Sequence, residues 1–311
     1  MKGNHHLAGA LLALTSATLY GFNPYFVNVA FDNGADPYGL MTGRYVIASA
    51  ILLAIRFARV GFGDWPKAPV AIRLFLLGAI GLYLNSVCVF NAIDRMPSGL
   101  AMAIFFFYPM IVVLLGWALY QHKPDMLVWA CLATTLFGVV LTVSGVSGSE
   151  VSGVIFIVSG AIVYAVYSVL GGKVMPKTDV ITGLWFVLTG AAFSFVVVWL
   201  LDPPGMPTTF PWTSAVVWST VEIAVVGTIF GMGLFFAGMN RIGASRSSIV
   251  QTFEVPVTIA SSLLLLNESM SVGQIIGAAL ILLGVIGVTW AETRRVDASR
   301  DGNSLEGVIT L

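Results

Sequence analysis

The sequence predicts an all-α membrane protein with ten transmembrane helices, and three observations support this fold class. Hydrophobic residues make up 58% of the 311 residues and charged residues only 10%, whereas soluble domains carry about a quarter charged residues. Apolar windows of roughly 20 residues, the length that crosses a bilayer as a helix, recur along the chain. The basic residues fall mainly in alternate connections, as they do when loops alternate between the two sides of a membrane.

The apolar windows are joined by short connections rich in polar residues, glycine or proline, such as 32–37 and 202–207. The first window is too long and too uninterrupted for a cleaved signal peptide. Residues 292–311 lose the apolar pattern and are expected to form a polar cytoplasmic tail. The predicted spans are 6–30, 38–57, 72–92, 97–120, 126–144, 151–173, 180–201, 214–239, 244–266 and 271–291.

The positions of lysine and arginine predict an orientation. With an inside N-terminus, 13 of the 15 basic residues lie on one side, Arg95 lies in an opposite loop and Arg44 lies within a span. Basic loops remain in the cytoplasm, so both termini are predicted to be cytoplasmic. We therefore expect a plasma membrane protein, with the bacterial inner membrane as its location. All eight tryptophans fall near predicted span ends and are interpreted as interfacial anchors.

The two halves of the chain resemble each other. A shift of 144 residues aligns Tyr20 with Tyr164, and a shift of 146 residues aligns Asp94-Arg95 with Asn240-Arg241. In the same alignment Pro109 misses Pro256 by one position. The shared order of such matches over five spans indicates an internal duplication.

The duplication predicts two five-helix repeats, residues 6–144 and 151–291. Because five is an odd number, the second repeat enters the membrane from the opposite side, and the repeats are inverted. In such architectures the substrate site lies at the repeat interface near the bilayer midplane.

On these features the chain resembles the EamA-type transporters of the drug/metabolite transporter superfamily. The resemblance rests on Arg44-Tyr45, on the segment 91–101 that leads to Pro109, and on a counterpart running from Ala237 through Pro256 to Asn267-Glu268. It covers about residues 7 to 291. The resemblance implies a permease, and family members of this size are mostly exporters of amino acids and other small metabolites that work by alternating access.

The ninth span carries a predicted polar stripe. Ser247, Gln251, Glu254 and Thr258 fall at i, i+4, i+7 and i+11 of a helix. Glu254 lies roughly 10 residues, or about 15 Å, from the inner end of the span. A carboxyl at that depth is costly unless it faces a cavity, a partner or a proton. The sequence therefore predicts a polar pocket at mid-membrane. If export is coupled to proton flow, Glu254 is the group expected to exchange a proton for substrate.

Two further ionisable residues, Arg44 and Glu222, lie within spans, and their depth permits Arg44 to pair with Glu254 or with Glu222. Alternatively, Arg44 extends to the outer interface or links two helices, and Glu222 is satisfied by Ser or Trp neighbours near that interface. Tyrosines near mid-span need a hydroxyl partner, which a wet cavity or an interhelical hydrogen bond supplies. The other predicted substrate-binding or coupling residues are Tyr20, Asn23, Tyr83, Asn85, Tyr108, Tyr164 and Tyr167.

We expect a secondary active transporter that exports a small organic metabolite such as an amino acid, with proton coupling left open. An uncoupled facilitator or channel is a second hypothesis. An intramembrane enzyme is a third, because residues 145–148 match a serine-protease pattern, although no histidine base lies in a span. The expected partners are a small-molecule substrate and the lipid bilayer, without nucleic acid, cofactor, metal ion or catalytic residue. A monomer is expected, and a homodimer stays open.

Overall fold

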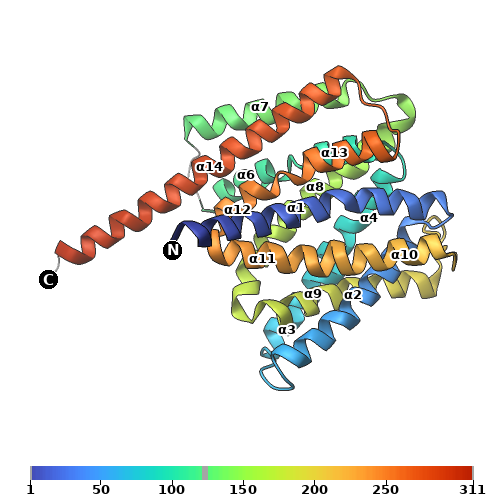
Figure 1. The fold of residues 1–311 in the computed structure, drawn as a ribbon, viewed down its shortest axis with the longest axis horizontal. Coiled ribbons are helices and arrows are strands. Elements are labelled where there is room, and N and C mark those ends of the chain that lie inside the picture. Colours follow the sequence, from blue (N-terminus) through green and yellow to red (C-terminus); the bar gives the residue numbers. More distant parts are fainter. Residues whose placement is uncertain (1, 121–124, 310–311) are drawn as a thin grey trace.

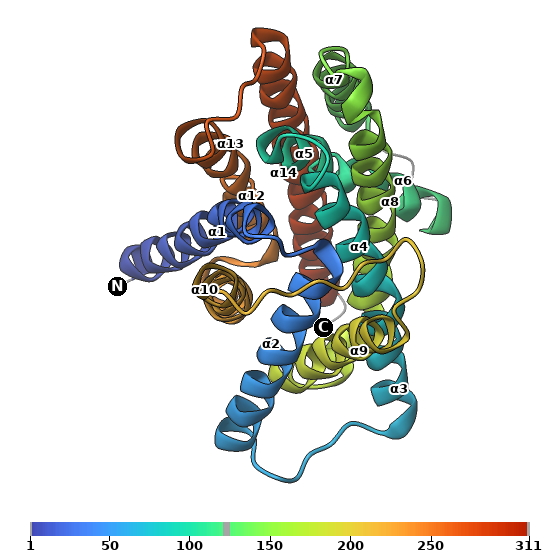
Figure 2. The same cartoon turned by 90° about the vertical axis from the view of Figure 1, so that its right-hand side faces the viewer.

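The computed structural model describes residues 2–120 and 125–309, and over these ranges its regular structure is helical throughout. Nine helical segments of the described residues are long and apolar enough to cross a bilayer, and they match the second to tenth predicted spans. The first predicted span corresponds to α1 (Lys2–Asp32). Polar residues such as Ser16 and Asn23 make α1 less apolar, yet it runs through the same bundle between α13 and α10 (Figures 1 and 2).

The chain forms two sets of helices. The first set is α1 (Lys2–Asp32), α2 (Pro37–Arg59), α3 (Ala68–Leu76), η1 (Leu77–Leu82), α4 (Tyr83–Ile93), α5 (Ser98–Phe105), α6 (Tyr108–Tyr120) and α7 (Met126–Val143), followed by the short η2 (Gly148–Glu150). The second set is α8 (Val151–Val174), η3 (Met175–Lys177), α9 (Val180–Leu201), α10 (Ser214–Glu222), η4 (Ile223–Phe230), α11 (Gly231–Ile242), α12 (Ala244–Gln251), α13 (Glu254–Leu265) and α14 (Val272–Ile309).

Four predicted spans are not single α-helices. The third and eighth spans each contain a π-helical segment, η1 and η4. The fourth span is broken between α5 and α6, and the ninth is broken between α12 and α13. π-Helical segments and breaks interrupt the regular hydrogen-bond ladder, and they are frequent at functional sites.

Proline accounts for the two breaks. Pro109 and Pro256 lack the N–H that would bond to the carbonyls of Phe105 and Thr252, four residues earlier. The chain instead forms i→i−3 bonds there, such as Phe107 N to Ile104 O at 3.1 Å. The continuous polar stripe predicted over the ninth span is therefore wrong, because the residues before and after the break do not share one helix face.

The element boundaries repeat along the chain. The first residues of α3 and α10, of η1 and η4, of α5 and α12, of α6 and α13, and of α7 and α14 are each 146 residues apart. The packing repeats in the same way: α1 contacts α11 and α13, and the equivalent helix α8 contacts α4 and α6. The helix pairs α2–α9 and α7–α14 also pack together.

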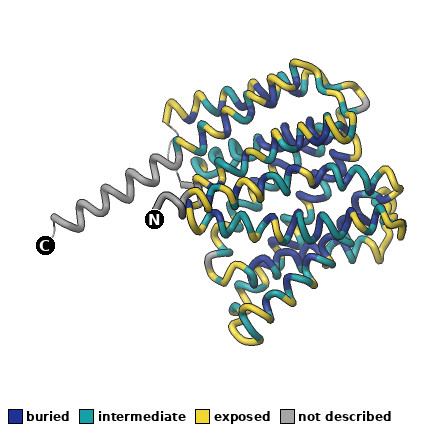
Figure 3. Tube along the Cα trace, viewed as in Figure 1, coloured by how far each residue is buried: buried dark blue, intermediate teal, exposed yellow. Residues whose placement is uncertain are grey.

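The first helix of each half thus lies among the helices of the other half, and the buried residues gather where the two sets meet (Figure 3). Many large apolar side chains, such as Phe137, Leu201 and Leu264, are exposed on the outside of the bundle. Exposed apolar side chains on the outside of the bundle fit a surface that faces lipid. The N- and C-termini lie at the same end of the bundle (Figure 1).

The helix α14 runs to Ile309 and so includes most of the predicted polar tail, residues 292–311. The loss of apolar pattern after residue 291 does not end the helix. Residues such as Glu, Arg and Ala are good helix formers whether or not they are buried, so an apolar pattern is not required for the helix to continue.

Candidate functional site

A cavity of about 1090 Å³ lies at the centre of the bundle. Its walls come from both halves, because α1, α2, α4, α5 and α6 contribute residues from the first half, and α8, α11, α12, α13 and α14 from the second. The volume lies at the upper end of the range for pockets that hold small organic molecules. The polar lining residues are Tyr20, Asn23, Arg44, Tyr45, Asn85, Ser86, Tyr108, Tyr164, Ser168, Ser248, Gln251, Thr252, Glu254 and Thr289.

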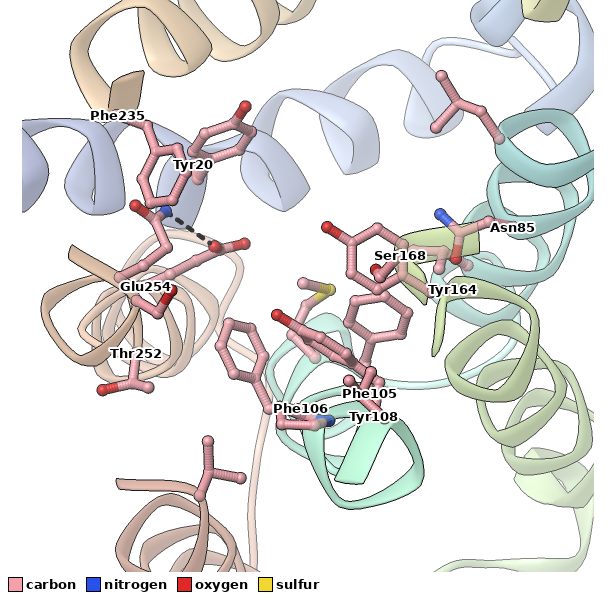
Figure 4. A pocket seen from close by; sticks show the side chains of 18 of the residues that line it. Tyr20, Asn85, Phe105, Phe106, Tyr108, Tyr164, Ser168, Phe235, Thr252 and Glu254 are labelled. Atoms are coloured by element: carbon pink, nitrogen blue, oxygen red, sulfur yellow. Dashed lines mark hydrogen bonds between the residues drawn. The ribbon is translucent and has the colours of Figure 1, made fainter. Parts of the chain in front are cut away.

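Glu254 lies on one wall, at the first residue of α13 directly after the break in the ninth span. The Gln251 amide donates a hydrogen bond from Nε2 to Glu254 Oε2 over 3.3 Å, drawn as the dashed line in Figure 4. Gln251 is the last residue of α12. The break therefore places an amide and a carboxyl side by side, facing the cavity.

Four aromatic side chains form the wall that faces Glu254 (Figure 4). The ring centroids of Tyr108 and Tyr164 are 4.6 Å apart in a T-shaped pair. The Phe105 ring lies 5.4 Å from each of these two tyrosines. Phe106 completes this wall and is buried. Rings in such contact form a rigid apolar surface, and the hydroxyls of Tyr108 and Tyr164 point from it toward Glu254.

Arg44 enters the cavity lining from α2 and is only 9% exposed. Its Nε donates to Thr228 Oγ1 over 3.1 Å, and its guanidinium lies over the rings of Tyr45 and Phe90 at 5.4 and 5.5 Å. Among the described residues no carboxylate forms an ion pair with Arg44. The pairing with Glu254 or Glu222 that depth alone permits is therefore not formed, and Arg44 instead links α2 to η4 through Thr228.

Several buried amide oxygens around the cavity have no hydrogen-bond partner among the described residues. They belong to Asn23, Asn85 and Gln251. Asn23 packs directly against Gly227, where a Cβ would lie within contact distance of its amide. Because a buried acceptor without a partner costs roughly 1–3 kcal/mol, these oxygens favour a bound donor or water.

The structure brings eight of the eleven predicted site residues into this cavity. Tyr83, Tyr167 and Glu222 do not line it. The Tyr83 ring packs on Phe195 at 4.7 Å. Tyr167 lies one turn after Tyr164, with ring centroids 5.7 Å apart, and packs beside Gly81. Glu222 lines a separate hollow on the outside of the bundle.

Two residues of the predicted stripe also lie elsewhere. Ser247 and Thr258 are fully buried and do not line the cavity. Thr252, which the stripe did not include, takes a place in the lining because the break turns it inward. The break changes the rotation of one helical segment relative to the other. Residue spacing counted across the whole span therefore does not identify which side chains face the cavity.

The sequence prediction missed other lining residues, among them Ser168, Ser248, Thr289 and Trp117. Serine and threonine are common in membrane helices, so their type alone carries no signal. The interpretation of Trp117 as an interfacial anchor alone is incomplete, since it lines the cavity and also packs against Trp129 at 5.5 Å. Trp117 lies eight residues, or about two helical turns, after Pro109 on α6. This spacing is the sequence feature that indicates that Trp117 lies on the same side of the helix as the break.

Within the described residues no group of three His, Cys, Asp or Glu side chains is arranged to hold a metal ion. Cys88 and Cys131 are free thiols. The cavity instead offers one carboxyl, one guanidinium, several amides and hydroxyls, and an aromatic wall. These groups can bind a small molecule that carries both polar and apolar parts.

The sequence is similar to a known transporter family and to several of its members. Residues 7–144 and 151–290 each match the EamA-like transporter family. The chain is 27% identical to an uncharacterized transporter of Synechocystis sp., over 97% of this chain and 98% of the relative. It is 25% identical to a probable amino-acid metabolite efflux pump of Escherichia coli, over 92% of this chain and 97% of the relative.

A solved crystal structure shares the fold with a TM-score of 0.61 at 19% identity, covering 92% of this chain and 98% of that one. The family match extends over both halves and nearly the whole sequence, and the helices are apolar enough to span a membrane. The chain is thus an integral membrane protein that belongs to the EamA-like transporter family.

Proposed function

We propose that this protein is a secondary active transporter that exports a small organic metabolite such as an amino acid. One observation carries the proposal: two broken helices, one from each half, meet at the same central cavity with a carboxyl on its wall. Broken helices place free backbone groups and helix ends at a substrate site in the middle of the membrane. A small solute can be held there while its hydration shell is replaced.

The two halves are proposed to be inverted repeats, 6–144 and 151–291. The equivalent packing of α1 and α8 against the opposite halves supports a two-fold relationship. The direction of the helices supports inversion, since α1 runs away from the end that holds the termini and α8 runs toward it (Figure 1). Inverted repeats allow a rocking motion that exposes a central site to each side in turn.

Alternating access needs contacts between the halves that form at one end and open at the other. Glu268, between α13 and α14, provides such a contact at the end opposite the termini. Its carboxylate accepts hydrogen bonds from Ser98 N at 3.0 Å, from Gly99 N at 3.3 Å and from the Ser262 hydroxyl. It thereby joins the start of α5 in the first half to α13 in the second.

An amino acid fits the groups around the cavity. Glu254 and the unpartnered amide oxygens can accept hydrogen bonds from an ammonium group, and Arg44 can bind a carboxylate. The aromatic wall can receive an apolar side chain. The Escherichia coli relative, described as a probable amino-acid metabolite efflux pump, supports the same substrate class and direction of transport.

We infer an orientation with both termini in the cytoplasm and a location in a bacterial inner membrane. The termini lie at one end of the bundle, and the distribution of basic residues favours that end as the cytoplasmic one. Glu254 is proposed as the group that exchanges a proton for substrate. The proposed partners are the solute and the bilayer, and the proposed state is a monomer.

Counterflow in proteoliposomes tests this function against the alternative of an uncoupled channel. A melting-temperature screen of amino acids, amines and nucleosides first identifies a ligand, because a compound that binds the folded state raises the melting point. Vesicles loaded with that unlabelled compound should then accumulate the labelled compound transiently against its gradient. Equal flux with and without internal compound would identify a channel and contradict the proposal.

A further inference from the structure

A second hollow, of about 290 Å³, lies on the outside of the bundle between α1 and α10. It shares no lining residue with the central cavity, so it is a separate feature. On α10 the lining residues recur at i, i+3, i+4 and i+7 and form one helix face. The hollow is lined by Tyr25, Phe26, Val29, Ala215, Trp218, Ser219 and Glu222.

Glu222 is the only ionisable carboxyl in this lining. Its Oε2 atom is buried and has no hydrogen-bond partner among the described residues. Arg44, which belongs to the neighbouring α2, donates to Thr228 instead and makes no ion pair with Glu222 in the described part of the chain. A buried carboxyl oxygen without a donor is costly, so a ligand that donates to it has a binding advantage.

The remaining walls of the hollow are largely aromatic. Tyr25 and Phe26 form a T-shaped pair with centroids 5.1 Å apart. Trp218 is 72% exposed on the outer surface of the bundle, one turn before Glu222. An exposed tryptophan on a membrane helix is typical of the interface between headgroups and acyl chains. The hollow therefore opens toward lipid near the membrane surface, with Glu222 about 6 Å deeper along the helix.

The internal repeat shows that the fold does not require an acid at this position. Leu76 is the last residue of α3, as Glu222 is of α10, and the two are 146 residues apart. Leu76 is an exposed apolar residue that faces outward from the bundle. The same helix junction, followed by a π-helical segment, thus forms with a leucine in one half and a glutamate in the other.

One carboxylate surrounded by aromatic rings is the chemistry that recognises an organic cation. We propose that the hollow between α1 and α10 binds the ammonium group of an amphipathic amine that enters from the bilayer. The ammonium group contacts the Glu222 carboxylate and the rings of Tyr25 and Trp218, and the apolar part of the molecule stays in the lipid. The hollow has room for such a head group and is small for a whole metabolite.

Quenching of Trp218 fluorescence tests this site. The purified protein in phosphatidylglycerol nanodiscs is titrated with 1-(4-bromophenyl)tridecylammonium, whose ammonium group can donate to Glu222 and whose bromine, on a ring beside that group, quenches a nearby tryptophan. Trp218→Phe identifies the part of the signal that comes from the hollow. We expect saturable quenching that Glu222→Gln weakens about tenfold or more, as expected for loss of a charged partner. Glu222→Leu, which copies the other half of the chain, should fold and also lose binding.

The controls separate this site from the central cavity and from simple partitioning into lipid. Glu254→Gln should leave Trp218 quenching unchanged, and 1-(4-bromophenyl)tridecan-1-ol, which has the same chain and ring without the charge, should show no saturable component. Added phosphatidylethanolamine or methylammonium, which both carry N–H donors, should compete with the probe more strongly than tetramethylammonium, which has none. Equal quenching by the alcohol, or loss of quenching in Glu254→Gln but not in Glu222→Gln, would overturn the proposal.

Discussion

Tyr108 and Glu254 occupy equivalent positions in the two halves of the chain, 146 residues apart, and both line the central cavity. Each is the first residue of the helix that resumes after a break. The duplicated backbone thus places a phenol ring on one wall and a carboxyl group on the facing wall (Figure 4). The repeated backbone brings both positions to the cavity. Because one position holds a phenol and the other a carboxyl group, the two facing walls differ in charge and hydrogen bonding.

The hydroxyl of Tyr164 is expected to contribute to solute binding, because it points into the cavity toward Glu254. Tyr164→Phe keeps the ring contacts and removes one hydrogen bond of about 0.5–1.5 kcal/mol. The KM for the transported solute should rise about two- to tenfold. Tyr167→Phe is the matched control, since Tyr167 is one turn away and outside the lining. Equal effects in the two variants would show that the cavity assignment of Tyr164 is mistaken.

Glu268 is expected to stabilise the folded protein through its contacts with α5 and α13. Glu268→Ala leaves the N–H and the hydroxyl of Ser98 without their acceptor, and the unfolding free energy should fall by about 1–3 kcal/mol. Glu150→Ala removes a carboxylate that accepts one bond, from Ser147 N at 2.9 Å, in an exposed turn. That variant should lose about 1 kcal/mol or less. Thermal melting in one detergent compares them, and a larger loss for Glu150 would contradict the role of Glu268.

Gly78 is expected to be essential for close packing of η1 against α9. A Cβ added there would collide with the backbone carbonyl of Val187. Gly78→Ala should therefore lower the unfolding free energy by about 1–3 kcal/mol or more, because backbone cannot move aside cheaply. Gly172→Ala is the control, since nothing lies within 4 Å of its added Cβ. Melting temperatures that change equally in both variants would argue against this packing.

Asp36 gives the fold a defined dependence on pH. Its Oδ1 caps α2 by accepting from Tyr38 N and Gly39 N, and its Oδ2 accepts from Thr209 N in the other half. Burial raises the pKa of Asp36 above its ordinary value of 3.8, and the N–H donors of Gly39, Thr209 and Tyr38 oppose this increase. The folded state therefore binds the proton more tightly than the unfolded state does.

A raised folded-state pKa means that this group stabilises the fold at low pH, and that the contribution is lost as the pH rises through that pKa. Asp36→Asn removes the titration. The unfolding free energy of the parent protein relative to this variant should thus decrease as the pH is raised from about 4. Melting curves of both proteins over a pH series measure the difference. A difference that grows with pH would show the opposite sign, and a constant difference would show no pKa shift; either result would contradict this prediction.

The sequence predicted the helical spans well because a membrane helix needs a long apolar window, and such windows are visible in composition. It did not locate the breaks. Pro256 indicates that one backbone hydrogen bond is missing. The helix nevertheless breaks before Glu254 and not at the proline, because the carbonyl that loses its donor belongs to Thr252. The π-helical segment η4 has the composition of an ordinary span, so only coordinates reveal it.

The candidate site was predicted in part for a related reason. Depth and polarity identified Glu254, Gln251 and Tyr164, which do line the cavity. Depth does not specify which side chains reach the cavity: Tyr167 lies at a similar depth and does not line it, and Glu222 lines a separate hollow. The direction of a side chain depends on helix phase and on the breaks, and both are set by tertiary packing.

Glu254 is proposed to exchange a proton for solute in the cavity between the two halves. Solute flux driven by a proton gradient, measured in proteoliposomes that hold Glu254→Gln or Glu222→Gln, tests it most directly, since both changes neutralise a carboxyl within a span. We expect Glu254→Gln to abolish proton-driven flux while solute exchange between equal pools continues, and Glu222→Gln to retain both. Proton-driven flux that persists in Glu254→Gln would contradict it.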